Sequence, residues 1–281
     1  MLYVNNNGDI LENGTYTIKT GNRGYLYGDG VFESIRILNG QPINLVNHIT
    51  RMLEGAVKLK MRPPSFFTLE FFEERIIELC SKSGITEGGR CRISLDRSSG
   101  GTFYPDSNEV EFYLEVYPTD INKFELNQRG VEVDIFMELK KDKTSLSNFK
   151  TKNGLIYILA AIAAKEKGLD DYLITNYSGG ILECTASNLF VVSNGVLYTP
   201  GLEEGCLAGT MRMQVINLAI SNGIKVYECN ILPQNLLVAD EIFLTNAITG
   251  ITWVSGYRTK RYFNNTARRM VDLLNQYWKM H

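Results

Sequence analysis

The feature that most constrains this chain is an uninterrupted apolar run, LIYILAAIAA, at residues 155–164. A helix needs about 18 apolar residues to cross a bilayer, so this run is too short to span a membrane. Gly168 follows the run and suits the left-handed residue that ends many helices. We therefore expect a buried helix over residues 153–168 and no membrane partner.

The length and the charge limit the class of protein. The 281 residues can form one large domain or two modest domains, at about 150 residues per domain. The 29 Lys and Arg residues nearly balance the 31 Asp and Glu residues, so the chain lacks the basic excess that is typical of nucleic-acid-binding domains. Nucleic acid is therefore not an expected partner.

The cysteine and histidine content narrows the chemistry. The five cysteines form no C-x-x-C pair and no apolar signal segment precedes them, which predicts reduced thiols in a cytoplasmic protein. His48 and His281 are too few for a His-rich metal site, so we predict no metal and catalysis by another residue type. The sequence also lacks the G-x-x-x-x-G-K-[ST], G-x-G-x-x-G and G-x-S-x-G motifs, which disfavours nucleotide binding and serine hydrolase chemistry.

Strand-like and helix-like patterns alternate in the first 117 residues. Asn39-Gly40 readily adopts positive φ and predicts a hairpin between strands at 30–38 and 41–45. Apolar residues at helical spacing predict helices over 46–61 and 69–84, and further strands are expected at 90–97 and 109–117. These elements indicate a mixed α/β domain in which helices pack on a sheet.

A polar stretch at 118–130, with Pro118 and Gly130, breaks both periodicities and is the best candidate for a linker. We predict a small N-terminal domain over residues 1–119 and a larger C-terminal domain over residues 120–281. The larger domain is expected to contain, in chain order, a strand at 131–137, the apolar helix, an antiparallel meander at 171–200, a helix at 210–223 and two further strand–helix passages.

Two residues of the second half could carry chemistry. Lys150 directly precedes the apolar helix, where partial burial would lower the pKa of its amine and suit Schiff-base formation. Most lysines are exposed, so an ordinary surface lysine is the alternative. Glu183 lies within an otherwise apolar hairpin, and its alternative interpretation is a strand residue that faces solvent.

The combination of motifs resembles a known family. FKTKNGL (149–155), LECTASNLF (182–190) and LAGTMR (207–212) follow YGDGVFESIR (27–36) and HITR (48–51). In this order and spacing they resemble the class IV aminotransferases, which are fold-type IV pyridoxal 5'-phosphate (PLP) enzymes. The resemblance implies a two-domain α+β fold of mixed α/β character, similar to D-amino acid aminotransferase. It also implies a homodimer, PLP at the domain interface and amino acid or keto acid substrates.

The resemblance assigns a role to each matching residue. Lys150, in the larger domain, matches the Schiff-base lysine that also shuttles the substrate proton. Glu183 matches the carboxylate that pairs with the pyridine nitrogen and so makes the ring an electron sink. Arg51 matches the phosphate-binding arginine, whose forked guanidinium suits phosphate oxygens.

Further residues complete the expected site. Gly209 and Thr210 open a helix whose N-terminal amides suit a phosphate. The other expected cofactor-binding residues are Ser187, Asn188, Asn246 and Ala247. The expected substrate-binding residues are Arg97, for a carboxylate, and Phe32, Ser34 and Tyr104.

The subfamily stays open between two activities. Branched-chain-type transamination to keto acids agrees with Phe32-Glu33, but the branched-chain enzymes carry Tyr where this chain has Gly154. A 4-amino-4-deoxychorismate lyase, which releases pyruvate and p-aminobenzoate, agrees with the R-x-S-G-G segment that begins at Arg97. A D-amino acid enzyme is less favoured because the expected R-x-H motif is absent. Alternatives outside catalysis are a PLP-binding regulatory protein and a cofactor-free interaction module.

Overall fold

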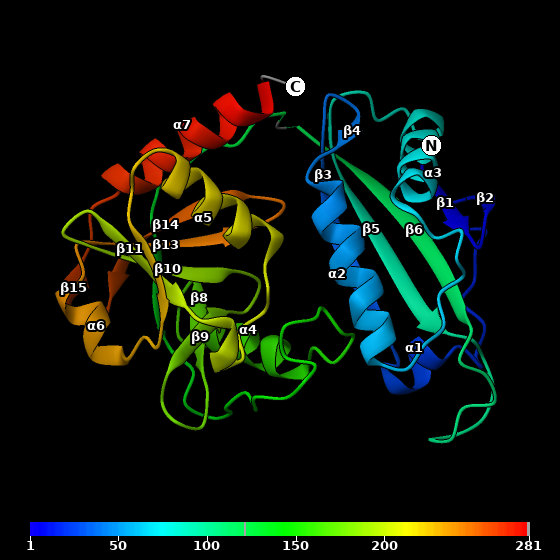
Figure 1. Ribbon diagram of the computed structural model, residues 1–281, viewed down its shortest axis with the longest axis horizontal. Helices are drawn as coiled ribbons and strands as arrows, with labels where there is room; N and C mark the ends of the chain where they lie inside the picture. The colour runs from blue at the N-terminus through cyan, green and yellow to red at the C-terminus, as the bar shows by residue number, and fades with distance from the viewer. Residues whose placement is uncertain (121, 280–281) are drawn as a thin grey trace. The chain divides into compact units, whose positions relative to one another are not determined.

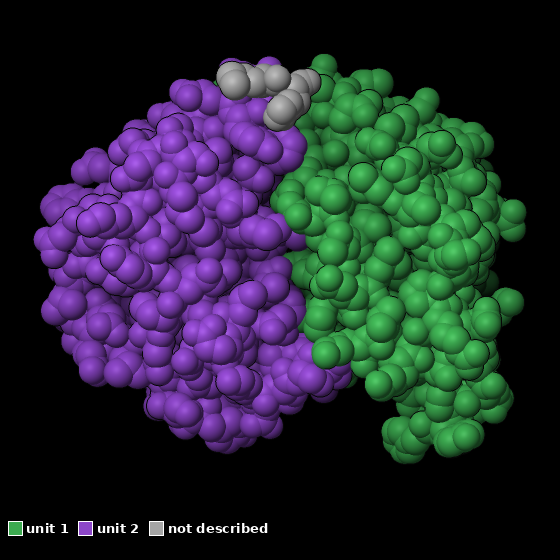
Figure 2. Space-filling view, in the orientation of Figure 1, with its two compact units in different colours: residues 1–123, 149–153 green, residues 124–148, 154–281 purple. Residues whose placement is uncertain are grey.

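The computed structural model describes residues 1–120 and 122–279, so His281 lies outside the described residues. The chain divides into two compact units, which Figure 2 distinguishes by colour. The first unit contains Met1–Lys123 and Phe149–Asn153, and the second contains Phe124–Asn148 and Gly154–His281.

The first unit is built on a six-stranded sheet (Figure 1). Its strands are β1 (Tyr3–Asn6), β2 (Asp9–Glu12), β3 (Gly30–Leu38), β4 (Gln41–Pro42), β5 (Gly88–Arg97) and β6 (Val110–Thr119). They follow the order β2-β1-β6-β5-β3-β4, and every neighbouring pair is antiparallel. Asn39 and Gly40 have φ values of 49° and 70° and join β3 to β4, which confirms the predicted hairpin.

The helices of the first unit are α1 (Arg23–Tyr27), α2 (Leu45–Lys58) and α3 (Leu69–Lys82). Thr68 caps α3 by accepting a hydrogen bond from Phe71 N at 3.2 Å. Ile49 of α2 and Ile76 of α3 share one hydrophobic core with Ile35 of β3. This core fixes one face of the sheet against the two helices.

The segment Phe149–Asn153 belongs to the first unit because it pairs with the start of β3. Phe32 N donates to Lys150 O at 2.9 Å, and Lys152 N donates to Gly30 O at 3.0 Å. Its grouping differs from the expectation that Lys150 lies in a domain that begins at residue 120. The domain division itself stays a prediction.

The second unit contains a nine-stranded sheet. Its strands are β7 (Val131–Ile135), β8 (Asp171–Thr175), β9 (Ile181–Cys184), β10 (Asn188–Ser193), β11 (Val196–Pro200), β12 (Val226–Cys229), β13 (Glu241–Asn246), β14 (Gly250–Tyr257) and β15 (Lys260–Arg261). The antiparallel pairings of β8 through β11 confirm the predicted meander. Glu183 of β9 pairs with Asn188 of β10, which closes the ring β10-β13-β14-β7-β8-β9.

The second unit has the helices α4 (Leu155–Glu166), α5 (Thr210–Ser221), α6 (Pro233–Val238) and α7 (Asn265–Lys279), and the 3-10 helix η1 (Leu202–Glu204). The fully buried Phe190 and Phe243 rings stack at 5.0 Å between their centroids. An apolar core of the second unit includes Leu189 of β10 and Leu244 of β13.

The apolar run forms α4, but the expectation of a buried helix is wrong. Ala160 and Ala164 are its buried residues, whereas Leu155, Ile158 and Ile162 are 74%, 55% and 50% exposed. The run is apolar on all sides, so its pattern could not indicate which side packs on the sheet. Within the described part of the chain, no helix combines the length and the apolar character that a membrane crossing requires.

Candidate active site

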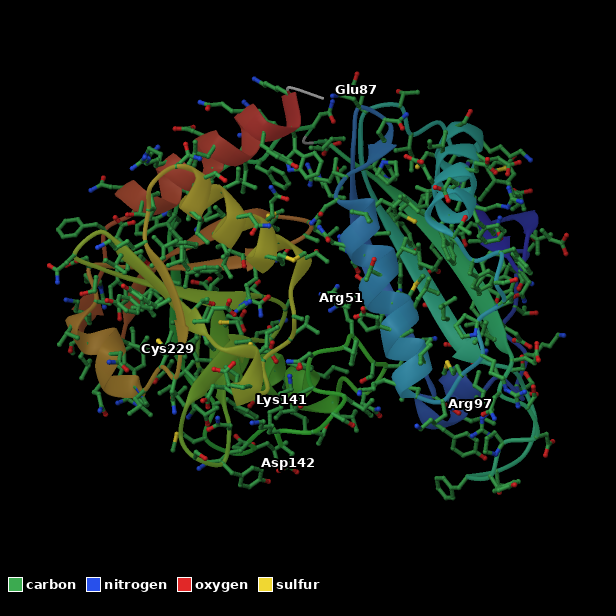
Figure 3. All side chains as sticks on the ribbon, viewed as in Figure 1. Arg51, Glu87, Arg97, Lys141, Asp142 and Cys229 are labelled. Atoms are coloured by element: carbon green, nitrogen blue, oxygen red, sulfur yellow. The ribbon has the colours of Figure 1, made fainter. Side chains whose placement is uncertain are left out.

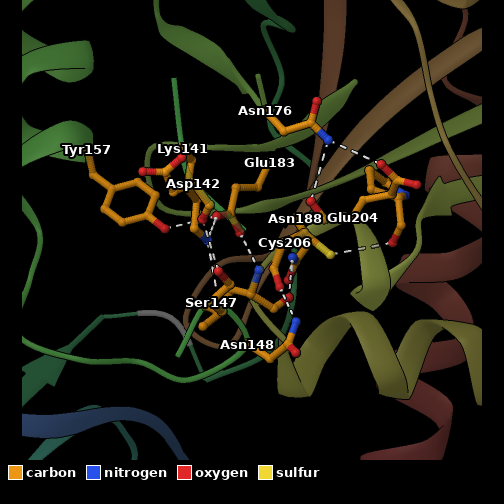
Figure 4. Close-up of polar contacts among 12 residues, drawn as sticks. Lys141, Asp142, Ser147, Asn148, Tyr157, Asn176, Glu183, Asn188, Glu204 and Cys206 are labelled. Carbon is orange, nitrogen blue, oxygen red and sulfur yellow. Dashed lines mark hydrogen bonds and ion pairs between the residues drawn. The ribbon is translucent and has the colours of Figure 1, made fainter. Parts of the chain in front are cut away.

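Glu183 lies at the centre of a hydrogen-bonded cluster in the second unit (Figure 4). Its Oε1 accepts hydrogen bonds from Lys141 Nζ at 2.6 Å and from the Tyr157 hydroxyl at 2.9 Å. Its Oε2 accepts one from the backbone N–H of Leu207 at 2.8 Å. The Glu183 side chain is 3% exposed, so the alternative that it faces solvent is wrong.

The donors around Glu183 differ in charge. Burial raises the pKa of Tyr157 far above its usual range, and the negative charge of Glu183 raises it further. The Tyr157 hydroxyl therefore keeps its proton and acts as a donor. Lys141 adds a cation, and its side chain is 13% exposed. The cluster thus meets the requirement that a buried carboxylate be both paired and hydrogen-bonded.

The closure of the ring of strands connects Glu183 to the start of α5. Asn188 is directly opposite Glu183, so the two side chains share one face of the sheet. Asn188 Nδ2 donates to Leu207 O at 2.8 Å, and the same carbonyl accepts from Gly209 N at 2.9 Å. A Cβ at residue 209 would collide with Asn188 Oδ1, so this close approach requires glycine.

The N-terminus of α5 has the properties of an anion site. Helix α5 begins at Thr210, which is buried, and Gly209 precedes it at the N-cap position. The helix dipole favours negative charge at this end of α5. The binding of an anionic group by Gly209 and Thr210 stays a prediction.

Three predicted residues of the second unit lie near the ends of β10 and β13. Asn246 Nδ2 donates to Ser187 Oγ at 3.1 Å, and Asn246 Oδ1 accepts from the turn amides of residues 248 and 249. Ala247 is half-buried in the same turn. Thr245, which pairs with Asn188, has a buried hydroxyl with no hydrogen-bond partner among the described residues. This hydroxyl is a donor that sequence reasoning missed.

Arg51 lies in the first unit, where α2 presents it to β3. Its Nε donates to Glu33 Oε1 at 2.8 Å and its Nη2 donates to Oε2 at 2.5 Å. His48 Nδ1 lies 2.7 Å from Glu33 Oε2. Burial alone would raise the pKa of Glu33, but the positive charge of Arg51 and the hydrogen bond from His48 outweigh it and hold the pKa at about 2.

His48 completes this buried network. Burial lowers the pKa of His48, although the neighbouring Glu33 opposes the effect, and the charges of Arg51 and Lys150 lower it further. We therefore assign a neutral imidazole whose Nδ1–H donates to Glu33. His48 and Glu33 together orient the Arg51 guanidinium, and the phosphate contact of Arg51 stays a prediction.

Lys150 packs against the predicted substrate residue Phe32. Its Nζ lies 4.6 Å from the Phe32 ring centroid, and the Arg92 guanidinium carbon lies 4.0 Å from the same centroid. Ser34 is directly opposite Arg92 in the β3–β5 pair, so its hydroxyl shares that face of the sheet. Burial lowers the pKa of Arg92, which remains a cation at neutral pH. The structure thus places Arg92 beside the predicted substrate residues Phe32 and Ser34.

The predicted substrate residues Arg97 and Tyr104 have other surroundings. Arg97, at the end of β5 (Figure 3), donates from Nε to Asp29 Oδ2 at 2.8 Å and from Nη2 to Leu59 O at 2.6 Å. Its Nη1 contacts Asn108 Oδ1. Tyr104 is 86% exposed in the loop between β5 and β6. Arg97 therefore holds the chain together around Asp29, and the substrate roles of both residues stay predictions.

Besides Thr245, three residues of these clusters were absent from the sequence prediction. Tyr157 is the one hydroxyl-bearing residue in the apolar run, which is a usable signal for a buried donor. Arg92 alternates with Ile93 and Leu95 on its strand, so its face could be read from the pattern. Lys141 stands among several lysines, and no local pattern distinguishes it.

The sequence is similar to those of known proteins. The sequence profile of the family described as amino-transferase class IV matches residues 30–257. A protein of Methanocaldococcus jannaschii, provisionally named a branched-chain-amino-acid aminotransferase, is 30% identical over 87% of this chain and 84% of its own. The D-alanine aminotransferase of Listeria monocytogenes is 27% identical over 89% and 86%, and the aminodeoxychorismate lyase of Vibrio harveyi is 26% identical over 85% and 87%.

Solved structures confirm the predicted fold. The branched-chain aminotransferase of Thermoproteus uzoniensis, solved with norvaline, has a TM-score of 0.89 at 24% identity and covers 98% of this chain and 94% of its own. The branched-chain amino acid aminotransferase of Escherichia coli has a TM-score of 0.84 at 21% identity and covers 95% and 91%. The chain belongs to the class IV aminotransferase family, whose enzymes are PLP-dependent aminotransferases and related lyases.

Proposed function

We propose that this protein binds PLP and transfers amino groups from branched-chain-type amino acids to keto acids. The observation that carries the proposal is the buried Glu183 carboxylate, which is linked through Leu207 to the start of α5, where Asn188 also contacts Leu207. An acceptor for a ring nitrogen and an anion site for a phosphate thus lie on one continuous stretch of the second unit.

The described residues fit this cofactor chemically. The unpartnered hydroxyl of Thr245 is a buried donor, and a buried donor without an acceptor costs about 1–3 kcal/mol, so a polar ligand would stabilise it. Glu183 would accept from the ring nitrogen, and Gly209 and Thr210 would donate to the phosphate. Arg51, Ser187, Asn188, Asn246 and Ala247 complete the proposed cofactor contacts, as the family resemblance implies.

Bound PLP supplies an electron sink for the bond that breaks at the substrate Cα. Lys150 would hold the cofactor covalently through Nζ until the amine of the substrate takes its place, and the released Lys150 amine would then be the general base for the Cα proton. The contact between Lys150 Nζ and the Phe32 ring limits the directions in which the amine can approach. Arg92 and Ser34 would bind a carboxylate of the substrate, with Arg97 and Tyr104 as further substrate residues.

A second activity is favoured by a specific observation. Ser34 is opposite Arg92, so a hydroxyl and a guanidinium are available on one face for a substrate with a second carboxylate. Glutamate and 4-amino-4-deoxychorismate both meet this description, and the similarity to the Vibrio harveyi lyase agrees with the latter. The alternative function is therefore the lyase reaction that releases pyruvate and p-aminobenzoate.

We also propose that the protein is a cytoplasmic homodimer. The exposed Leu155, Ile158 and Ile162 of α4 form an apolar face of the kind that a second copy of the chain could cover. Light scattering coupled to size exclusion should give twice the chain mass. A monomer at micromolar concentration would contradict this part of the proposal.

Spectroscopy of the purified protein tests the function. We expect a visible absorption band when PLP is bound and loss of this band on borohydride reduction. After the reduction, the cofactor should remain attached to the peptide that contains Lys150. Lys150→Ala should remove the band, whereas the control Lys140→Ala, at an exposed lysine, should keep it. Absence of the band from the unmodified protein would refute PLP binding and would favour a module without cofactor chemistry.

Substrate assays then separate the activities. L-Leucine with 2-oxoglutarate should give L-glutamate and the keto acid of leucine. Release of pyruvate from 4-amino-4-deoxychorismate without reaction of L-leucine would instead establish the lyase. Reaction of D-alanine alone would assign the D-amino acid subfamily, and a bound cofactor without any turnover would indicate a PLP-binding regulatory protein.

A further inference from the structure

Lys141 is held by two oxygen atoms inside the second unit (Figure 4). Its Nζ lies 2.6 Å from Glu183 Oε1 and 3.3 Å from Ser147 O, and its backbone N–H donates to Thr175 O at 2.9 Å. We propose that Lys141 is a positioning residue, which fixes the Glu183 carboxylate for the ring nitrogen of the cofactor. This inference rests on the proposed function.

The three donors to Glu183 come from separate parts of the chain. Lys141 and Tyr157 converge on Oε1 from opposite ends of the segment around Lys150, and Leu207 donates to Oε2 from the loop before α5. Rotation of the carboxylate would break at least one of these hydrogen bonds. Its orientation is therefore set by three anchors.

Lys141 differs from the other two donors in its charge. A hydrogen bond between an ammonium and a carboxylate is roughly twice as strong as one between neutral groups, and the attraction grows in a buried environment. Tyr157 and Leu207 are neutral donors. Loss of Lys141 would leave Glu183 buried beside neutral donors, which favours a rotated carboxylate. The acceptor for a ring N–H would then be weakened.

The same ammonium braces the turn that precedes Lys150 in the chain. Lys141 Nζ contacts Ser147 O in this turn. The turn is also closed by Ser147 Oγ, which donates to Asp142 O at 3.1 Å. Lys150 follows Ser147 by three residues. Lys141 therefore connects the carboxylate to the segment that leads into the proposed Schiff-base lysine.

Two cofactor forms test the role of Lys141 without a catalytic assay. One is PLP, and the other is its carbocyclic analogue, in which C–H replaces the ring nitrogen. Lys141→Met should raise the Kd of PLP about tenfold, because the carboxylate no longer presents its oxygen to the nitrogen. The Kd of the analogue should change less than about twofold, because the analogue has no nitrogen to bind.

Matched variants separate positioning from structural damage. Lys141→Arg should restore the Kd of PLP to within about threefold of the original, because it keeps a cationic donor. Lys140→Met, at the exposed neighbouring lysine, should leave both Kd values unchanged. If Lys141→Met does not fold, Lys141→Gln should show the same selective loss of PLP affinity.

The outcomes distinguish this inference from the proposed function. Equal weakening of PLP and the analogue in Lys141→Met would overturn the positioning role, because damage to the fold affects both compounds alike. Unchanged PLP affinity would also overturn it. Failure of the unmodified protein to bind either compound would refute the proposed function and, with it, the role of Lys141.

Discussion

The network of Glu33, Arg51 and His48 should make the stability of the first unit depend on pH. The carboxyl group of Glu33 has a pKa of about 2, compared with an ordinary value of 4.5. At 1.36 kcal/mol per pKa unit, this difference corresponds to about 3 kcal/mol of stability. Because the pKa is lowered on folding, this stability is present above pH 4.5 and is lost as the pH falls towards 2.

Glu33→Gln removes the titrating group and keeps its size. At pH 7 we expect the variant to be less stable than the original protein by roughly 3 kcal/mol, since the charge that pairs with Arg51 is gone. Between pH 7 and pH 3 the original protein should lose about 2 kcal/mol through Glu33, and the variant should lose none of it. The gap between the two proteins should therefore narrow at acid pH.

The assay must report on the first unit. Trp253 and Trp278 both lie in the second unit, so their fluorescence does not follow unfolding of the first. Amide hydrogen exchange of peptides from β3 and α2, corrected for the intrinsic rate at each pH, measures the opening free energy there. The control is Glu73→Gln, at an exposed glutamate of α3. Its difference in stability from the original protein should be the same at pH 3 and pH 7. If the opening free energies of Glu33→Gln and the original protein differ equally at pH 3 and pH 7, the reasoning is refuted.

Three further substitutions test the contacts of Glu183 and Asn188 in the second unit and the predicted substrate contact of Arg92. Gly209→Ala places a Cβ against Asn188, so the Kd of PLP should rise at least about tenfold, and a Kd within twofold of the original would contradict the close approach. Tyr157→Phe removes one hydrogen bond to the Glu183 carboxylate and should lower the free energy of unfolding by about 2 kcal/mol in urea titrations followed by tryptophan fluorescence; no change would show that the bond contributes nothing. Arg92→Gln should raise the KM for L-glutamate more than that for L-leucine, because leucine has no second carboxylate, and equal changes would exclude a contact between Arg92 and the second carboxylate.

Local patterns predicted the elements where local physics decides them. The strand at 30–38 matches β3 because residues of one alternating set, Val31, Ile35 and Ile37, face the core. The Asn39-Gly40 pair formed the expected turn because both residues adopt positive φ. Helix α4 was misjudged because a helix that is apolar on all sides carries no information about its packing.

In the site, too, local sequence predicted some features and long-range contacts decided the others. Motifs predicted Lys150, Glu183 and Arg51 as candidates, since these residues stand in distinctive local sequences. Their partners could not be identified in that way. Lys141 and Tyr157 reach Glu183 across 42 and 26 residues of sequence, and no local signal encodes those distances.

The sequence by itself determined the element types, the family and the main candidates for cofactor binding, because turn chemistry, periodicity and short motifs act over a few residues. Only the tertiary structure decided how these candidates are held. The pairing of Glu183 with Asn188 closes a ring of strands, and it brings the carboxylate to Lys141, Tyr157 and Leu207. Burial and charge pairing depend on such long-range contacts, which is why the environment of each site residue came from the fold.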